Sequence, residues 1–301
     1  MTEHGPVPHW EGASVVVEPP DTRTGSWAGA PSATLVDGVF YLAYRLRLPI
    51  GHGRGYVNVI AKSDDGVNFQ PVSEVRREEF DSESLERPAL LRAPDGRWRL
   101  YVSVATTGTK HWRVVLLEAD TPEKLALASP RTVLPGDETV GVKDPVIVHA
   151  EGRWHLWASV HPLESDEHAD RMTTEYATSP DGVEWTWQGT ALAGREGAWD
   201  ARGVRFSSVV LDGREALALY DGRATAEENW EEATGVAHGL LGADGLFTPF
   251  VADEQLPTRS PFAPGGLRYV SVVPLPTGGS RLYYEGTRAD GAHELRTELL
   301  P

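Results

Sequence analysis

The chain has 301 residues and carries 44 acidic against 28 basic side chains, for a formal net charge of -16. This acidic excess argues against a protein that follows nucleic-acid phosphates or binds anionic membranes, and it favours a neutral or cationic small ligand. The absence of cysteine excludes disulfides, thiolate metal sites and cysteine nucleophiles. The start, MTEHGPVPHW, has no signal-peptide pattern and no apolar run is long enough to cross a bilayer, so we expect a cytoplasmic protein.

One phrase recurs along the chain: a proline after a charged or small residue, an apolar run, a turn with glycine, and an aromatic run. It is clearest in APSATLVDGVFYLAYR, RPALLRAPDGRWRLYVS and KDPVIVHAEGRWHLWAS, whose prolines Pro31, Pro88 and Pro145 are evenly spaced. Degenerate copies begin near Gly203 and Gly266. A constant period of this kind indicates a repeat architecture.

Each copy has the pattern of two strands joined by a tight turn. A second turn signal, Ser-x-Asp-Gly, follows in SDDGVNF from Ser63 and SPDGVEW from Ser179, and Asp-Gly supplies the positive φ that tight hairpins need. The chain is therefore predicted to be all-β, a five-bladed β-propeller with four-stranded antiparallel blades. A many-stranded β-sandwich, the alternative, predicts no constant period.

We expect one domain over residues 1–301, with blades that begin near residues 27, 86, 143, 200 and 260. The segment before Trp27, which contains ASVVVEPP, would add the outer strand that closes the ring against the last blade.

A polar funnel is predicted at the centre, because the first strand of each blade lines the channel and the second strand returns to the same face. Three carboxylates from consecutive blades, Glu86, Asp144 and Asp200, are the candidate catalytic residues. Crowded carboxylates do not all ionise easily, so one can hold a proton while another acts as a base, as glycosidic cleavage requires.

Further residues at the strand ends are candidates for substrate binding. They are aromatic, basic or polar: Trp27, Arg45, Arg87, Lys143, His161, Trp199, Arg202, Asp221, Arg223, Arg259 and Glu285. The alternative for the candidate carboxylates is that Glu86 pairs with Arg87 or Arg202, and Asp144 with Lys143, as ion pairs that only close the channel.

The acidic loop HPLESDEHAD, flanked by His161 and His168, is interpreted as a solvated loop. No metal ligand and no cofactor is predicted, and a structural divalent cation in the channel stays an open alternative.

These motifs resemble the five-bladed propeller glycosidases, which include glycoside hydrolase families 43, 32, 68 and 130. The opening blade of family 130 is most similar to the segments GSWAGAPSATLVDGVFYLAYR and AKSDDGVNF. The acidic start of its second blade resembles LERPALL, and the start of its third blade resembles KDPVIV. The family 43 pattern implies a base Asp in the first blade, where this chain has Ala30 and Pro31. It also implies a general acid Glu in the third blade, where this chain has Asp144.

Family 130 has no base in the first blade, and it has Asp where this chain has Glu86. Its phosphorylases hold inorganic phosphate with basic residues, a role that the resemblance assigns here to Arg45, Arg87, Lys143, Arg202 and Arg223.

The predicted function is an inverting hydrolase of a short soluble glycoside, with Glu86 or Asp144 as general acid and Asp200 as the base or as a ligand of a sugar hydroxyl. Inversion requires roughly 6.5 to 9.5 Å between the two carboxyl groups. A family 130-type glycoside phosphorylase, a non-catalytic sugar- or metabolite-binding propeller, and a lyase or isomerase on the same scaffold are the alternatives. The predicted partner is a small carbohydrate, and neither nucleic acid nor membrane is expected.

Overall fold

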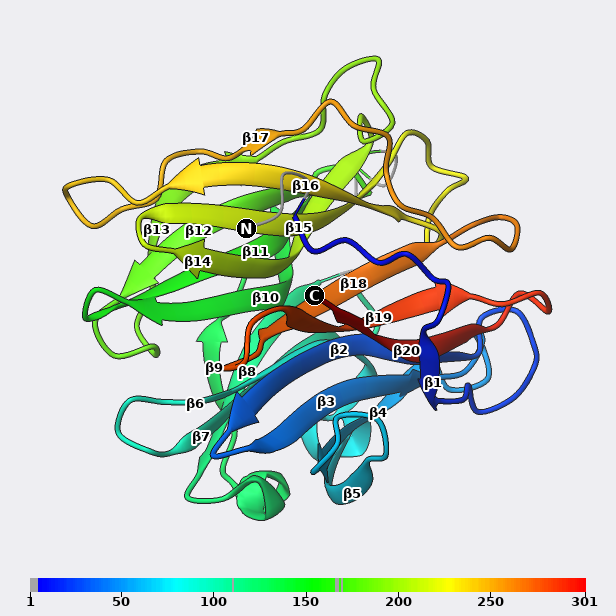
Figure 1. The fold of residues 1–301 in the computed structure, drawn as a ribbon, viewed down its shortest axis with the longest axis horizontal. Helices are drawn as coiled ribbons and strands as arrows, with labels where there is room; N and C mark the ends of the chain where they lie inside the picture. Colours follow the sequence, from blue (N-terminus) through cyan, green and yellow to red (C-terminus); the bar gives the residue numbers. More distant parts are fainter. Residues whose placement is uncertain (1–4, 110, 166–167, 169) are drawn as a thin grey trace.

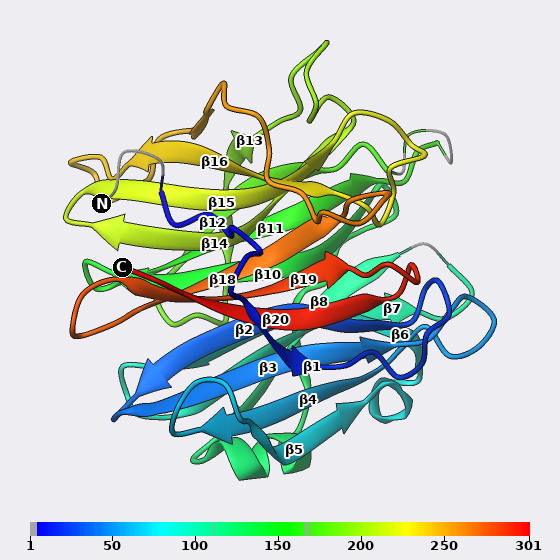
Figure 2. The ribbon, with the colours of Figure 1, turned by 45° about the vertical axis from the view of Figure 1, so that its right-hand side comes forward.

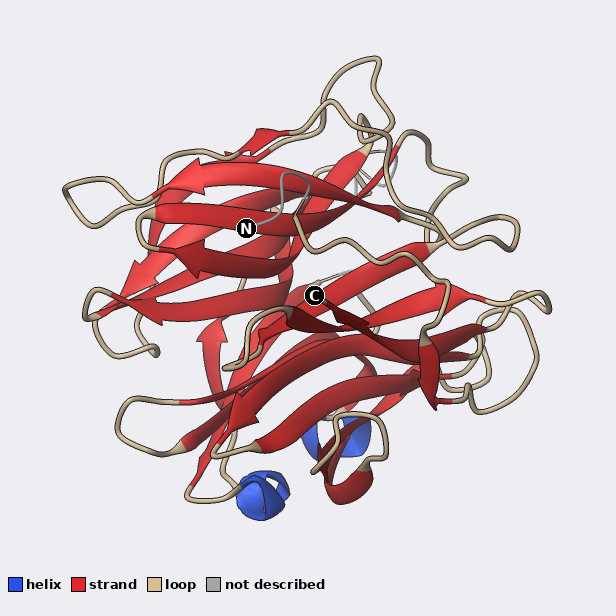
Figure 3. Cartoon of the chain, viewed as in Figure 1, coloured by secondary structure: helices blue, strands red, loops and turns tan. Residues whose placement is uncertain are grey.

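The computed structural model describes residues 5–301 apart from 110, 166, 167 and 169. Strands dominate it (Figure 3), and the helices of this described part are two short 3-10 turns, η1 (Arg77–Phe80) and η2 (Pro122–Leu127). Within the same residues no helix has the length and apolar character that a membrane span needs. The predicted all-β class is confirmed.

Four-stranded antiparallel sheets follow one another along the chain (Figures 1 and 2). One contains β6 (Ser82–Arg92), β7 (Trp98–Thr106), β8 (Trp112–Ala119) and β9 (Arg131–Leu134). The next contains β10 (Val140–Ala150), β11 (Arg153–Pro162), β12 (Thr173–Ser179) and β13 (Thr186–Leu192). The third contains β14 (Gly203–Asp212), β15 (Glu215–Arg223), β16 (Ala233–Leu240) and β17 (Val251–Ala252).

A larger, eight-stranded sheet combines the two ends of the chain. One half contains β2 (Trp27–Val36), β3 (Val39–Arg47), β4 (Gly55–Ser63) and β5 (Gln70–Arg76). The other contains β18 (Leu267–Pro274), β19 (Ser280–Thr287), β20 (His293–Leu300) and β1 (Ser14–Val17), which pairs with β20 antiparallel. A single parallel bridge between Trp27 and His293 joins the halves. The N-terminal strand thus belongs to the sheet built from the C-terminal residues.

The first strands β2, β6, β10, β14 and β18 form the inner layer, where each contacts the next and β18 contacts β2. The pairing register of every one of them shifts at a bulge. The backbone is left-handed at three bulge residues, Ala30, Asp144 and Tyr269. Pro31 and Pro145 lie in these bulges, where a missing N–H group costs no ladder hydrogen bond. The recurring proline of the sequence therefore marks the bulge of the inner strand.

Hydrophobic cores fill the spaces between neighbouring sheets. Trp157, Phe206 and Phe250 belong to the cluster between the β10–β13 and β14–β17 sheets. Tyr101 and Leu156 belong to the cluster between the β6–β9 and β10–β13 sheets. The apolar faces of the strands are therefore buried between sheets, and the polar heads of the inner strands remain for the centre.

The Ser-x-Asp-Gly turns form as predicted and fasten adjacent sheet segments. In the first turn, Ser63 Oγ accepts from the N–H of Gly66 at 2.9 Å and Asp65 Oδ1 accepts from the N–H of Val67 at 2.8 Å. Gly66 has a φ of 74°, which glycine adopts without strain. The hydroxyl of Tyr283, on β19, donates to the Gly66 carbonyl at 2.9 Å.

The guanidinium of Arg87 lies buried among the inner strands. It donates to the carbonyl oxygens of Ser207 at 2.7 Å, Pro145 at 2.8 Å and Pro31 at 3.3 Å. These oxygens belong to β14, β10 and β2, and Arg87 itself belongs to β6. One side chain therefore connects four of the inner strands.

We expect Arg87→Met to lower the free energy of unfolding by about 3 kcal/mol or more, because three buried carbonyls lose a charged donor. Urea unfolding followed by tryptophan fluorescence measures the change. The control is Arg92→Met, which removes an exposed arginine paired with Asp37 and should change the free energy by about 1 kcal/mol or less. Equal losses in the two variants would contradict the central role of Arg87.

Candidate active site

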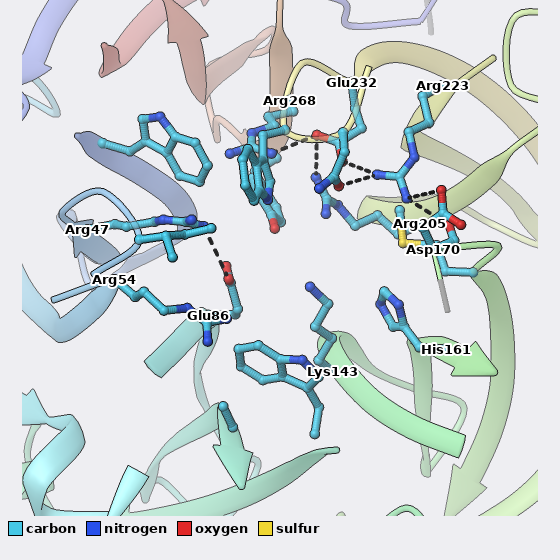
Figure 4. Close-up of a pocket in the computed structure, with 18 of the residues that line it drawn as sticks. Arg47, Arg54, Glu86, Lys143, His161, Asp170, Arg205, Arg223, Glu232 and Arg268 are labelled. Carbon is cyan, nitrogen blue, oxygen red and sulfur yellow. Dashed lines mark hydrogen bonds and ion pairs between the residues drawn. The ribbon is translucent and has the colours of Figure 1, made fainter. Parts of the chain in front are cut away.

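A cavity of about 430 Å³ opens at the centre of the molecule, over the heads of the inner strands (Figure 4). Its ionisable lining residues come from all parts of the chain: Arg47, Arg54, Glu86, Lys143, His161, Asp170, Arg205, Arg223, Glu232, Arg268 and Tyr269. Trp27, Trp112 and Trp230 add aromatic walls. The predicted polar centre is therefore a real cavity with a charged lining.

One position of each inner strand, at the bulge or shortly before it, faces this centre. In chain order the residues at this position are Gly29, Glu86, Lys143, Arg205 and Arg268. The pairing places Arg45 opposite Gly29, Ser159 opposite Lys143, Asp221 opposite Arg205, and Glu285 opposite Arg268. The last four of the inner-strand residues line the cavity.

Gly29 makes room for a buried carboxylate. A Cβ atom at Gly29 would lie 2.1 Å from Glu285 Oε2, which only a displaced Glu285 could avoid. That carboxylate accepts from Arg45 at 3.1 Å, from Arg268 at 2.8 Å and from the Ala30 N–H at 3.0 Å. Although burial opposes ionisation, these arginines hold the pKa of Glu285 well below its usual value. Glu285 is thus a fixed anion behind the cavity wall.

Glu86 is the acidic residue at the head of β6, and its side chain reaches the cavity. It forms an ion pair with Arg45, and Arg47 Nη1 lies 3.8 Å from its second oxygen. The Asn58 side chain donates to the Glu86 carbonyl at 3.2 Å and so fixes its backbone. Among the predicted catalytic residues, Glu86 is therefore the one that the structure places on the cavity surface.

Asp144 lies buried beneath the adjacent cation, with Lys143 Nζ and Arg205 Nη1 each 3.7 Å from its Oδ2 atom. The Arg87 N–H donates to its Oδ1 atom at 3.2 Å. Burial opposes ionisation here, but the charges of Lys143 and Arg205 lower the pKa of Asp144. Asp144 therefore holds the cations of the cavity floor in position and does not itself line the cavity.

Glu232, just before β16, is held by three arginines. Its oxygens lie 2.6 Å from Arg268 Nη1, 2.8 Å from Arg223 Nη1 and 3.4 Å from Arg205 Nη2. Despite the cost of burial, these charges keep the pKa of Glu232 far below its usual range. The side chain is 1% exposed, so it is a locked counter-ion in the cavity wall.

Asp170 is more open, with a side chain that is 25% exposed. Its Oδ2 atom lies 2.9 Å from Arg202 Nε and 3.8 Å from Arg223 Nη2. Partial burial raises the pKa of Asp170, but the hydrogen bond from Arg202 and the two charges lower it overall. In Figure 4, Asp170 and Glu86 lie on different sides of the cavity, with Lys143 between them.

The faces of Trp27 are already occupied. The His293 ring stacks on it at 4.8 Å, and the Arg47 and Arg268 guanidinium carbons lie 3.9 Å and 4.6 Å from its ring centre. Trp27 lines the cavity, as predicted. Its ring is in contact with His293 and two arginines, so no free face is left on which a sugar could stack.

Several predicted site residues lie elsewhere. Asp200 accepts from Arg195 Nε at 2.9 Å and from the Tyr220 hydroxyl at 2.8 Å, and Trp199 stacks on Tyr220 at 5.5 Å. None of these four residues lines the cavity as described. The predicted convergence of Asp200 with Glu86 is therefore corrected: Asp200 belongs to a buried network beside β15.

The remaining predictions divide in the same way. Lys143, His161 and Arg223 line the cavity, as predicted. Arg202 is not a lining residue but pairs with Asp170, which is one. Arg259 lies outside the lining and forms an ion pair with Glu228, with 3.5 Å between the charged atoms. The others are buried behind the wall: Arg45, Arg87, Asp221 and Glu285.

Asp221 supports the cavity wall from behind. It pairs with Arg205 at 2.9 Å, and burial raises its pKa to about 6. It therefore fixes the position of an arginine that does line the cavity.

The error at the fourth and fifth inner strands has a simple cause. When the spacing of the first three copies is extended, the residue equivalent to Lys143 in the fourth copy is Asp200. The connections before the fourth and fifth inner strands are longer, so the residues equivalent to Lys143 are Arg205 and Arg268. The sequence contains the correct signal, because GVRFSS from Gly203 and GLRYVS from Gly266 align with each other on these arginines. Asp170, Trp230 and Glu232 come from connections between strands and have no repeat signal.

Within the described residues, no group of three or more His, Asp or Glu side chains has the arrangement of a metal site. The acidic loop before Asp170 includes residues 166, 167 and 169, which lie outside the described part of the chain.

Comparison with family models and with curated protein sequences gives no match. Solved structures do match. One, from work on the GH130 family of mannoside phosphorylases and its hydrolases that target β-1,2 mannosidic linkages in Candida mannan, has a TM-score of 0.66 at 16% identity and covers 98% of this chain and 96% of its own. A family 43 enzyme from Xanthomonas citri, in complex with xylotriose, has a TM-score of 0.69 at 13% identity over 96% and 90% of the two chains.

The α-L-arabinofuranosidase from Lactobacillus brevis has a TM-score of 0.67 at 14% identity over 93% of this chain and 92% of its own. The fold is that of propeller glycoside hydrolases. Identities this low show the fold alone. In this glycoside-hydrolase fold, the side chains around the cavity carry the information on chemistry.

Lys143 offers a direct test of the cavity-floor electrostatics. Burial lowers its pKa to about 8, and the Asp144 carboxylate acts against this decrease. Asp144→Asn should therefore move the pKa of Lys143 further below 8, because it removes the charge that favours the ammonium form. The chain has four lysines, so a pH titration of 13C-labelled lysine side chains by NMR resolves this group.

The control is Asp200→Asn, which removes a carboxylate outside the cavity and should leave the pKa of Lys143 unchanged. An unchanged or higher pKa of Lys143 in Asp144→Asn would contradict the assigned role of Asp144.

Proposed function

We propose that the chain is a five-bladed β-propeller that hydrolyses a short soluble glycoside in this cavity. The ring of contacts among β2, β6, β10, β14 and β18 supports five blades, with the eight-stranded sheet divided at the bridge between Trp27 and His293. The observation that carries the activity is a cavity of about 430 Å³ with Glu86 and Asp170 in its wall, in a fold shared with glycoside hydrolases.

Two carboxylates that flank the scissile bond are the equipment for glycosidic hydrolysis. Asp170 suits the base, because its side chain is 25% exposed against 7% for Glu86, so a water molecule can reach it more easily. Glu86, the other carboxylate at the cavity surface outside the locked Glu232, is then the general acid. We keep the inverting mechanism, which requires roughly 6.5 to 9.5 Å between the two carboxyl groups once substrate is bound.

Phosphorolysis is the second candidate, because the described part of the cavity lining holds six arginine and lysine side chains beside three carboxylates. In that reaction an inorganic phosphate, held by these cations, replaces water as the nucleophile, and only one catalytic carboxylate is needed.

The first experiment is a screen of aryl glycosides and disaccharides with and without inorganic phosphate. We expect one sugar to be released without phosphate, and Glu86→Gln and Asp170→Asn each to lower kcat/KM by about a hundredfold or more. Asp200→Asn, outside the cavity, should keep kcat/KM within about threefold. Release that depends on phosphate would replace the hydrolase by the phosphorylase.

Rescue experiments separate the two roles. Glu86→Gln should keep most of its activity on 2,4-dinitrophenyl glycosides, whose leaving group needs no proton, and Asp170→Asn should be rescued by azide, which replaces the activated water. If azide instead rescued Glu86→Gln, and Asp170→Asn kept its activity on the 2,4-dinitrophenyl glycosides, Glu86 would be the base and Asp170 the general acid. If no glycoside is cleaved although a sugar still raises the melting temperature, the chain is a binding propeller and the hydrolase proposal fails.

A further inference from the structure

The charge of the cavity is opposite to that of the chain as a whole. The net charge of -16 favoured a neutral or cationic ligand, but the lining residues that the structure describes include Arg47, Arg54, Arg205, Arg223, Arg268 and Lys143 against three carboxylates. The local field at a partly enclosed site decides which ligand enters, and distant surface charges are screened by salt. The charge of the described lining therefore favours a different ligand from the one that the net charge of the whole chain favours.

The carboxylates of the lining are already neutralised by arginines. Glu232 pairs with three of them, Asp170 with two, and Glu86 with Arg45 and Arg47. None of these ion pairs involves Lys143. Among the described lining cations, Lys143 and Arg54 are therefore not paired with these carboxylates, and Arg54 has Glu83 at 3.7 Å as a partner outside the lining.

Lys143 is poorly compensated in the described structure. Its Nζ atom forms no hydrogen bond to a described residue, and its nearest carboxylate oxygen, Asp144 Oδ2, is 3.7 Å away and equally close to Arg205. The side chain is only 12% exposed, and Nζ lies 5.0 Å from the ring centre of Trp112. An ammonium carries three hydrogen-bond donors, and those of Lys143 are left for a ligand or water in the cavity that this residue lines.

Figure 4 shows the Lys143 side chain pointing into the cavity between Glu86 and His161. A ligand anion placed there would accept hydrogen bonds from the ammonium and would also lie near the guanidinium of Arg205, which shares Asp144. Charge-assisted hydrogen bonds of this kind are about twice as strong as neutral ones.

We propose that the cavity takes a saccharide that carries its own anionic group, a carboxylate or a phosphate ester, and that this group binds Lys143. The inference rests on the proposed function in that the ligand is a sugar, and it names the substrate class. A uronide or a sugar phosphate is then preferred to the neutral glycoside of the same stereochemistry.

Equilibrium binding tests this without turnover. Isothermal titration of the wild-type protein uses D-glucuronate, D-galacturonate, D-mannuronate, glucose 6-phosphate and mannose 6-phosphate, each against its neutral parent sugar, and inorganic phosphate alone. We expect at least one anionic sugar to bind about tenfold more tightly than its parent, and the difference to shrink in about 1 M NaCl. The uronate and phosphate arms decide which anionic group the site accepts.

The variants assign the contact to Lys143. Lys143→Met should remove the preference for the anionic sugar and change the affinity for the neutral parent by about twofold or less, and Lys143→Arg should restore part of the preference. The matched control, Lys62→Met, replaces an exposed lysine paired with Glu123 and should change nothing. Circular dichroism and melting temperatures check that each variant is folded.

Three results would overturn the inference: no anionic sugar in the set binds more tightly than its parent, the preference survives in Lys143→Met, or inorganic phosphate alone shows the dependence on Lys143. Cleavage of neutral glycosides with no anionic preference would leave the hydrolase standing and remove this inference. Lys143-dependent binding of an anionic sugar with no cleavage of any glycoside would support this inference and contradict the proposed hydrolase.

Discussion

The buried guanidinium of Arg87 is the contact on which the centre of the molecule depends. It joins the carbonyls of β2, β10 and β14 to β6, at the bulges where the inner strands leave their regular pairing. The Arg87 N–H also donates to the carboxylate of Asp144. The residues that set the spacing of the inner strands are therefore the same ones that fix the cavity floor.

Around this centre, charge is balanced in layers. Glu285, Asp221 and Asp144 lie behind the wall as fixed anions, and they hold Arg45, Arg268, Arg205 and Lys143 in place. The cations in turn hold Glu86 and Glu232 at the surface of the cavity. Arg45, Arg268 and Arg205 have carboxylate partners on both sides, so this part of the lining is preorganised before any ligand enters.

Much of the architecture could be read from the sequence, because hairpin signals and the even spacing of the first three copies depend on local chemistry. The same regularity found Glu86 and Lys143. It failed at Arg205 and Arg268, where longer connections shift the strands by several residues and only a comparison of the two degenerate copies shows the register. Asp170 and Glu232 lie in connections that the repeat does not describe, and ion pairing between distant segments leaves no local pattern. The role of Trp27 was missed for a related reason, since what covers an aromatic face depends on residues far away in the sequence.

Because β1 pairs with β20, the eight-stranded sheet cannot be complete until the last strand has been synthesised. Ser14 lies opposite Thr297, so this contact joins segments from opposite ends of the described chain. On the ribosome, β1 is made long before β20 and has no partner until β20 has been synthesised. The contacts among the inner strands include that of β18 with β2, and Arg268 and Tyr269 of β18 line the cavity, so the cavity is complete only after this strand has been made. A nascent chain that has not reached β18 can therefore form its first sheets but lacks part of the cavity lining.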